Sequence, residues 1–256
     1  MSIFQAILLG VVQGLTEFLP VSSSAHLILV PYILGWPEFP LVFDTSLHLG
    51  TALAVLIYFA KDFLKMDRNM LLKLVLGSVP VVVVGFLFGD VIENVLGGVG
   101  GVIIFLLVGS LIMLAAERKA LKRKDLRIKN VSVTDSIVIG VAQMFALLPG
   151  ISRSGVTISA GILRGFSREQ AARFSFMLSM PAVVGAGFYQ LSKTYQLIGF
   201  QIGYVSWIIG IVSSFITGLL VINFLINSLK QNGLMIYVYY RLFLVLLILS
   251  LFFKAV

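Results

Sequence analysis

The sequence predicts an all-α integral membrane protein with six transmembrane helices and two re-entrant helical hairpins, arranged as an inverted-topology repeat. Three observations predict this class. The 256 residues are 59% hydrophobic and only 12% charged, so a water-soluble fold could not cover its own core and lipid must be the main solvent. Long apolar stretches alternate with short basic loops. Two further apolar regions are each interrupted by Pro, Gly and Ser.

The ordinary spans are the apolar stretches that hold close to the roughly 20 residues needed to cross the hydrocarbon core. They lie at 40–60, 74–92, 99–116, 172–191, 203–229 and 234–253. The first residues have neither the basic start nor the cleavage site of a secretory signal, and they carry Gln13 and Glu17. We therefore expect this segment to belong to the mature structure.

The two interrupted regions are 3–36, broken at 19–26, and 133–163, broken at 148–155. A broken helix leaves backbone amides and carbonyls unpaired, and a membrane tolerates them only where protein or a water-filled cavity satisfies them. We interpret both regions as re-entrant helical hairpins.

The two hairpins also resemble each other in sequence. The order Gly-Val-Val-Gln, Leu-Pro, Ser-Ser-Ser in the first is matched by Gly-Val-Ala-Gln, Leu-Pro, Ser-Arg-Ser in the second, about 130 residues later. We expect a single membrane domain, 1–256, with a first repeat at 1–130 and a second at 131–256. Three spans follow each hairpin, so the second repeat starts on the opposite side of the membrane.

The basic residues support this threading. Fifteen of the nineteen fall on one side, which the positive-inside rule makes cytoplasmic: Lys61, Lys65, Arg68, Lys73, Arg118, Lys119, Lys122, Arg123, Lys124, Arg127, Lys129, Arg164, Arg168, Arg173 and Lys230. Only Lys193 and Lys254 fall on the other side, and Arg153 and Arg241 lie within apolar regions. The net charge of +8 is thus a topology signal, and we expect no nucleic-acid partner.

Ionisable residues inside a membrane are costly and generally face a functional cavity. Six need explaining: Glu17, His26, Asp44, His48, Arg153 and Arg241. The chain has no cysteine and no GK[ST], HExxH or GxSxG motif, which argues against thiol chemistry, nucleotide hydrolysis, zincins and hydrolase-fold esterases.

The first hairpin offers acid, hydroxyl and imidazole groups. Gln13 and Glu17 are four residues apart and share one helix face that points at the break. Ser22, Ser23 and Ser24 occupy the break, where a helix start can bind an anion and a serine is both a cap and a candidate nucleophile. His26 lies just beyond. The alternative is structural, with the serines as caps and Glu17 pairing with His26.

The second hairpin offers a permanent positive charge. Arg153 stands in Gly150-Ile151-Ser152-Arg153-Ser154-Gly155, where small residues let a ligand approach and a guanidinium matches two phosphate oxygens. A structural pair between Arg153 and Glu17 is the alternative, and such a pair could open to admit phosphate and a divalent cation. If the hairpin tips meet, they assemble what phosphoryl transfer requires.

The motifs resemble one family in particular. Residues 13–26, QGLTEFLPVSSSAH, are similar to the (E/Q)xxxE and PxSSxxH signature of bacterial undecaprenyl pyrophosphate phosphatases, and Pro149–Gly155 is similar to their PGxSRSG motif. The resemblance extends over the whole chain, including Phe43-Asp44, Leu49-Gly50, Phe174-Ser175-Phe176 before Pro181, and Tyr240-Arg241.

The resemblance implies a bacterial plasma-membrane enzyme that removes the terminal phosphate of a 55-carbon polyprenyl pyrophosphate. This activity would recycle the lipid carrier of peptidoglycan synthesis and would confer bacitracin resistance. It implies a Mg²⁺ or Ca²⁺ cofactor held by Glu17 and Gln13, a homodimer, and a site accessible from the outer face. It assigns Ser23 as nucleophile, His26 as proton shuttle and Arg153 as phosphate clamp. Ser22, Ser152 and Ser154 would assist in binding phosphate.

Several points stay open on these residues. This chain has the neutral Gln13 where the family has Glu or Gln, which puts a two-carboxylate metal site in doubt unless Asp44 contributes. Arg241 either supports the pocket or pairs with Asp44. The rival function is a transporter or flippase of an anionic polyprenyl lipid, since inverted repeats with broken helices are common in transporters. A non-catalytic scaffold would leave buried Glu17 and Arg153 without a use.

Overall fold

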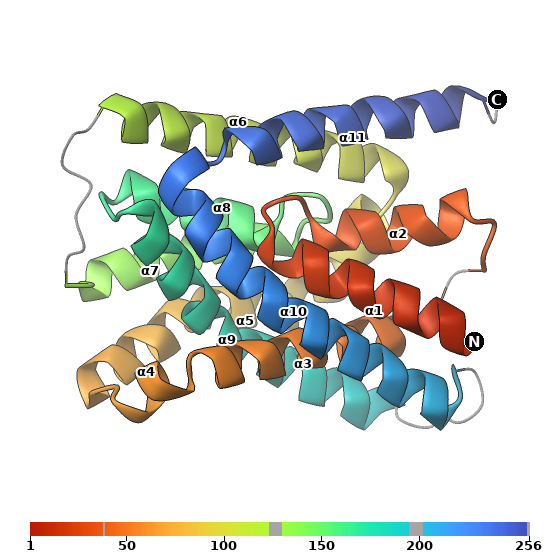
Figure 1. Ribbon diagram of the computed structural model, residues 1–256, viewed down its shortest axis with the longest axis horizontal. Helices are drawn as coiled ribbons and strands as arrows, with labels where there is room; N and C mark the ends of the chain where they lie inside the picture. The colour runs from red at the N-terminus through yellow and green to blue at the C-terminus, as the bar shows by residue number, and fades with distance from the viewer. Residues whose placement is uncertain (38, 123–129, 195–201, 255–256) are drawn as a thin grey trace.

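The computed structural model describes residues 1–37, 39–122, 130–194 and 202–254, and the regular elements within these ranges are helices (Figure 1). They are α1 (Ile3–Phe18), α2 (Ser23–Ile33), α3 (Leu41–Tyr58), α4 (Ala60–Leu64), α5 (Arg68–Leu96), α6 (Val99–Lys122), α7 (Val133–Met144), the 3₁₀ turn η1 (Phe145–Leu147), α8 (Arg153–Leu163), α9 (Arg168–Thr194), α10 (Tyr204–Asn232) and α11 (Met235–Lys254).

Five helices in the described ranges are long and apolar enough to cross a membrane. They are Leu41–Tyr58, Arg68–Gly89, Val99–Lys122, Arg168–Lys193 and Tyr204–Asn232, and they match five of the six predicted spans. The sixth prediction, 234–253, falls on α11, whose apolar stretch Met235–Leu251 is shorter. The chain is therefore a multi-pass membrane protein, and its regular elements in the described ranges are helices.

Each interrupted region folds as two helices joined by a break. Leu19 and Leu148, which precede the two prolines, both have extended backbones, with ψ of 136° and 119°. A residue before proline is pushed out of the helical conformation because the proline ring clashes with it. The Leu-Pro pair thus ends α1 and η1, and the chain turns back into α2 and α8.

The two hairpins share their start and their break at a spacing of 130 residues. α1 begins at an N-cap, Ser2, and α7 begins at Ser132, each with a complete capping box. In the described chain the only non-glycine residues with positive φ are Ser22, at 77°, and Ser152, at 71°, and each precedes the second helix of its hairpin. These shared details support the repeat that the sequence predicts.

Each hairpin packs against a helix from the other half of the chain. α1 lies along α10, and α7 lies along α5. Both contacts are close: a Cβ on Gly10 would lie 2.5 Å from the Gly210 carbonyl oxygen, and one on Gly140 would lie 1.9 Å from that of Gly77. In Figure 1, α1 starts at the end of the molecule that holds both termini, whereas α7 starts at the opposite end, which also holds α4.

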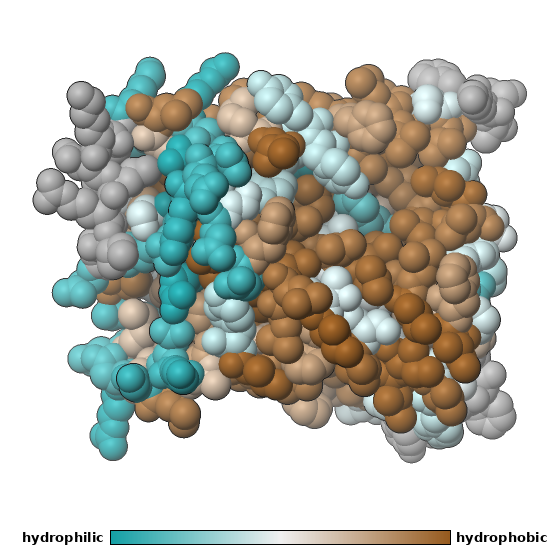
Figure 2. Space-filling model, in the orientation of Figure 1, coloured by the Kyte–Doolittle hydropathy of each residue, from teal (hydrophilic) through white to brown (hydrophobic). Residues whose placement is uncertain are grey.

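The charged side chains gather at one end. Figure 2 shows hydrophilic residues concentrated at the end that holds α4 in Figure 1, with hydrophobic residues over much of the remaining face. Four ion pairs involve basic residues that the sequence places on the cytoplasmic side. They join Arg164 to Asp135, Arg168 to Glu117, Arg173 to Asp62 and Lys230 to Glu169. Arg123, Lys124, Arg127, Lys129 and the Lys254 side chain lie outside the described part.

The contact between α5 and α7 makes a testable prediction. We expect Gly140→Ala to destabilise the fold by about 1–3 kcal/mol, because the new methyl group meets the Gly77 backbone rather than a mobile side chain. Thermal unfolding in detergent would measure the change. Gly100→Ala is the control, since nothing lies within 4 Å of a Cβ at that helical position. Equal unfolding temperatures for the two variants would contradict the packing argument.

Candidate active site

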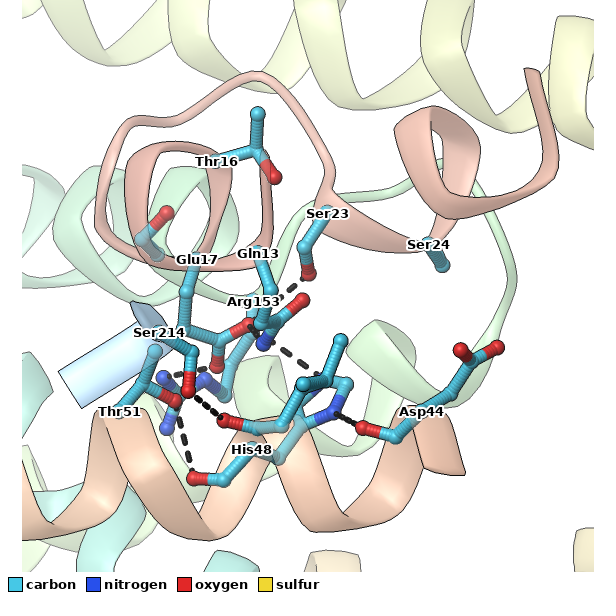
Figure 3. Close-up of polar contacts among 12 residues, drawn as sticks. Gln13, Thr16, Glu17, Ser23, Ser24, Asp44, His48, Thr51, Arg153 and Ser214 are labelled. Carbon is cyan, nitrogen blue, oxygen red and sulfur yellow. Dashed lines mark hydrogen bonds and ion pairs between the residues drawn. The ribbon is translucent and has the colours of Figure 1, made fainter. Parts of the chain in front are cut away.

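The carboxylate of Glu17 is the centre of a polar cluster inside the protein (Figure 3). Arg153 Nη2 lies 2.6 Å from Glu17 Oε1. The Ser23 hydroxyl and the Gln13 amide nitrogen each donate to Glu17 Oε2 at 2.9 Å. His48 Nε2 lies 3.4 Å from the same Oε2 atom. Four side chains from α1, α2, α3 and α8 thus meet on one carboxylate.

The broken helices place these groups. Gln13 and Glu17 lie one turn apart near the end of α1. Ser23 and Arg153 are the first residues of α2 and α8, so each stands directly after a break. The sequence prediction that the hairpin tips meet, with a guanidinium facing a hydroxyl and a carboxylate, is confirmed by these contacts.

Further hydrogen bonds join the two tips. The Gly150 amide donates to the Ser24 hydroxyl at 3.4 Å, and the Ser154 hydroxyl donates to the Leu19 carbonyl at 3.2 Å. Ser152 caps α8 by accepting from the Gly155 amide. Ser22, in contrast, makes no side-chain cap on α2, and its hydroxyl lies 3.1 Å from that of Ser24.

The cluster is buried and not all of its hydrogen-bonding groups are used. Gln13 is fully buried and Glu17 is 6% exposed. Within the described structure, Arg153 Nη1 and Gln13 Oε1 are buried without a hydrogen-bond partner. Such groups are uncommon and call for a partner, which can be an ordered water, an ion or a ligand. A small pocket, which Gln13 does not line, has walls formed by Glu17, Phe18, Thr51, Ala52, Val55, Arg153, Ser179 and Val183.

The contacts of His26 differ from the pairing with Glu17 that the structural alternative predicted. Its Nδ1 donates to the Ser22 carbonyl at 2.7 Å, and its Nε2 lies 2.8 Å from the Tyr240 hydroxyl. The structural alternative in which His26 pairs with Glu17 is not what these contacts show. Its role as proton shuttle stays a prediction.

His48 is the site residue that the sequence analysis left without a role. Its Nδ1 donates to the Asp44 backbone carbonyl at 2.8 Å, which directs Nε2 toward Glu17. The one signal in the sequence was an ionisable residue inside the apolar stretch 40–60. Only the folded chain brings α3 against α1, so no motif indicated this contact.

Arg241 supports the site indirectly. It is fully buried on α11, and its guanidinium donates to the Ser110 hydroxyl and to the carbonyl oxygens of Phe105, Leu106 and Gly150. Of the two roles left open for it, support of the pocket is the one that these contacts favour. Asp44 takes part in the site through the carbonyl that orients His48.

The donor set suits a hard divalent cation in part. Glu17 offers one carboxylate, and Mg²⁺ is commonly bound by one or two carboxylates with water and substrate phosphate completing the shell. The Gln13 amide nitrogen faces Glu17, so its unpaired Oε1 would reach the same cation only after the amide turns. No group of three or more His, Asp or Glu side chains in the described ranges is placed to bind a metal by itself. A cation at Glu17 would therefore need a phosphate substrate and water as its further ligands.

Comparison with known proteins places this site in context. Residues 6–247 match the family described as "Bacitracin resistance protein BacA". The chain is 41% identical over 256 residues to the undecaprenyl-diphosphatase of Thermodesulfovibrio yellowstonii, covering 98% of each protein. It is 40% identical to that of Caldicellulosiruptor bescii, covering 98% of this chain and 97% of the relative, and 42% identical to that of Alcanivorax borkumensis, covering 94% and 96%.

The buried ion pair predicts a stability effect. Glu17→Ala leaves the Arg153 charge uncompensated inside the protein, and we expect a loss of about 3–5 kcal/mol. The double variant Glu17→Ala/Arg153→Ala should recover much of that loss, because both charges are gone. Thermal unfolding in detergent measures both.

The control is an exposed ion pair. Arg173 and Asp62 are paired at 3.0 Å with side chains that are 34% and 42% exposed, so Asp62→Ala should cost no more than about 1 kcal/mol. If Glu17→Ala costs no more than Asp62→Ala, the buried pair does not hold the tips together.

Proposed function

The chain belongs to the family of the bacitracin resistance protein BacA, and we propose from this premise that it is an undecaprenyl-diphosphatase with the Glu17 cluster as its active site. It hydrolyses undecaprenyl pyrophosphate to undecaprenyl phosphate and inorganic phosphate, which recycles the lipid carrier of peptidoglycan synthesis. The observation that carries the site assignment is that the Ser23 hydroxyl and the Arg153 guanidinium both bind the Glu17 carboxylate.

Arg153 is the proposed phosphate clamp. Its Nη1 is buried without a partner in the described structure, so one arm of the guanidinium is available to a phosphate oxygen. The start of α2 faces the same region, and its amides are not capped by the Ser22 side chain. Helix starts attract anions because their amides are unpaired. Ser22, Ser152 and Ser154 are proposed to assist from the tips.

Ser23 is the proposed nucleophile, and Glu17 is its base. In the first step the Ser23 oxygen forms a bond to the terminal phosphorus and its proton passes to Glu17 Oε2, 2.9 Å away. The bond from phosphorus to the bridging oxygen breaks, and the lipid monophosphate leaves with the electron pair. Water then attacks the phosphorus of the phosphoserine and the bond from phosphorus to the Ser23 oxygen breaks. The proton held on Glu17 returns to the Ser23 oxygen, and both water hydrogens leave with the inorganic phosphate.

Glu17 and Gln13 are proposed to hold the divalent cation, Mg²⁺ or Ca²⁺, through Glu17 carboxylate oxygens and the unpaired Gln13 Oε1. When bound, such a cation would neutralise charge on the pyrophosphate. Opening of the Arg153–Glu17 pair would then let the guanidinium turn to the terminal phosphate while the carboxylate keeps its contact with Ser23.

The membrane arrangement is part of the proposal. Six spans and two re-entrant hairpins in the bacterial plasma membrane, with the basic end of the molecule in the cytoplasm, would place both termini outside. The first hairpin would then enter from outside and make Glu17 accessible from the outer face. Gathering of hydrophilic residues at the α4 end supports this orientation (Figure 2). A homodimer rests on the family resemblance alone.

Phosphate release tests the enzymatic function directly. Purified protein in detergent should release phosphate from a polyprenyl pyrophosphate. Ser23→Ala should lower the rate by roughly a thousandfold or more, because the nucleophile is lost. Arg153→Ala should lower it by about 10²–10³, the scale of losing one electrostatic donor.

Two exposed residues serve as matched controls for these variants. Ser192→Ala and Arg118→Ala change exposed positions outside the cluster and should keep wild-type rates. Full activity of Ser23→Ala with a normal fold would remove Ser23 as nucleophile. If the wild-type protein moves the lipid across vesicles without releasing phosphate, the rival transporter function is correct.

The metal assignment predicts a chelator effect. Addition of EDTA should abolish phosphate release, and Mg²⁺ or Ca²⁺ should restore it, since a pyrophosphate carries more negative charge than Arg153 alone would neutralise. Gln13→Leu, which removes the unpaired Oε1 while keeping the side-chain size, should raise the cation concentration needed for half-maximal rate by about tenfold. Release that is insensitive to EDTA would end the proposal of a metal cofactor.

A further inference from the structure

Two neighbouring residues on α11 reach the breaks of both hairpins. Tyr240 contacts the first hairpin through His26, and Arg241 contacts the second hairpin at Gly150. α11 packs mainly on α6, and it shares an apolar cluster with α2. In the described structure these two polar side chains hydrogen-bond α11 to the hairpins, and neither forms a hydrogen bond with Glu17, Ser23 or Arg153.

The first link runs from α11 to the positive-φ serine. The Ser22 carbonyl can only accept a hydrogen bond, so His26 Nδ1 carries the hydrogen in their 2.7 Å contact. In the neutral ring Nε2 is then an acceptor, and the Tyr240 hydroxyl donates to it at 2.8 Å. The two rings lie nearly parallel, with an interplanar angle of 7°. The chain of bonds fixes the carbonyl of the residue directly before Ser23.

The second link runs from α11 to the other break. Arg241 Nη2 donates to the Gly150 carbonyl at 2.8 Å, and Arg241 Nε donates to the Ser110 hydroxyl at 3.0 Å. Gly150 has a φ of 106° and stands three residues before Arg153. α6 makes room for the guanidinium, because a Cβ on Gly109 would lie 2.3 Å from Arg241 Nη2.

We propose that Tyr240 and Arg241 together are positioning residues that set the separation of the two hairpin tips, and hence of Ser23 from Arg153. The inference rests on the proposed function of the tips. A helix backbone holds the two residues at a fixed spacing, and each is bonded to a backbone carbonyl of a different break, Tyr240 through His26. Catalytic rates depend steeply on such spacing, since a misplacement of about 1 Å can cost 10²-fold.

The first test removes one hydroxyl. Tyr240→Phe should lower kcat for phosphate release by roughly two- to tenfold, the scale of one lost hydrogen bond, and should leave KM and the unfolding temperature near wild type. Tyr239→Phe is the matched control, because Tyr239 is the adjacent tyrosine on the same helix, is 63% exposed and forms no side-chain hydrogen bond with the described residues. It should keep the wild-type kcat.

The second test loosens the other link without touching either break. Ser110→Ala removes one acceptor of Arg241, and we expect kcat to fall by roughly two- to tenfold with KM unchanged. Ser250→Ala is the control. Ser250 and Ser110 each donate to a carbonyl of the preceding helical turn, Leu247 and Leu106, but Ser250 is exposed and lacks the contact with Arg241. Arg241→Lys, which keeps the charge and one donor, should retain more activity than Arg241→Met.

The outcomes separate this inference from the proposed function. If Ser23→Ala and Arg153→Ala are inactive while Tyr240→Phe and Ser110→Ala keep the wild-type kcat, the positioning role is wrong and the active site stands. If KM rises and the unfolding temperature falls while kcat stays at the wild-type value, the two residues have a structural role only. If Ser23→Ala and Arg153→Ala remain active, the proposed site itself fails.

Discussion

The structure depends on one ion pair buried inside the protein, between Glu17 of the first hairpin and Arg153 of the second. Either charge alone would be costly to bury, because an apolar environment does not solvate it. Each hairpin therefore carries a group that is acceptable only when the other hairpin is present. The requirement brings together segments that lie 136 residues apart in the chain, and it places Ser23 against the same carboxylate.

The breaks that make the site possible also create a problem of their own, since a chain that stops being helical inside a membrane exposes carbonyl groups. Three of these carbonyls have identified donors. The Leu19 carbonyl accepts from Ser154, that of Ser22 accepts from His26, and that of Gly150 accepts from Arg241. Ser154, His26 and Arg241 thus have a structural use, because each donates a hydrogen bond to a backbone carbonyl at a break.

Much of this could be predicted from the sequence because the signals are local. The Leu-Pro pairs end helices through the geometry of proline itself, and their recurrence with Ser22 and Ser152 marked both hairpins. Glu17 and Arg153 were recognisable as unlike charges in apolar surroundings. The contact of His48 with Glu17 was not predictable, because it depends on how α3 packs against α1. For the same reason Arg241 left two roles open, and the hydrogen bond from Tyr240 to His26 joins residues 214 positions apart.

The chemistry arises where two similarly built hairpins differ. Both begin with a serine as the N-cap, both carry a buried glutamine in the first helix, and both turn at a serine with positive φ. Four residues after Gln13 stands Glu17, whereas four residues after Gln143 stands Leu147. At the first position of the second helix, one hairpin has Ser23 and the other has Arg153. Identical hairpins would place like charges or no charges together. Because one supplies the carboxylate and hydroxyl and the other the guanidinium, the interface between the two hairpins becomes a site suited to phosphate.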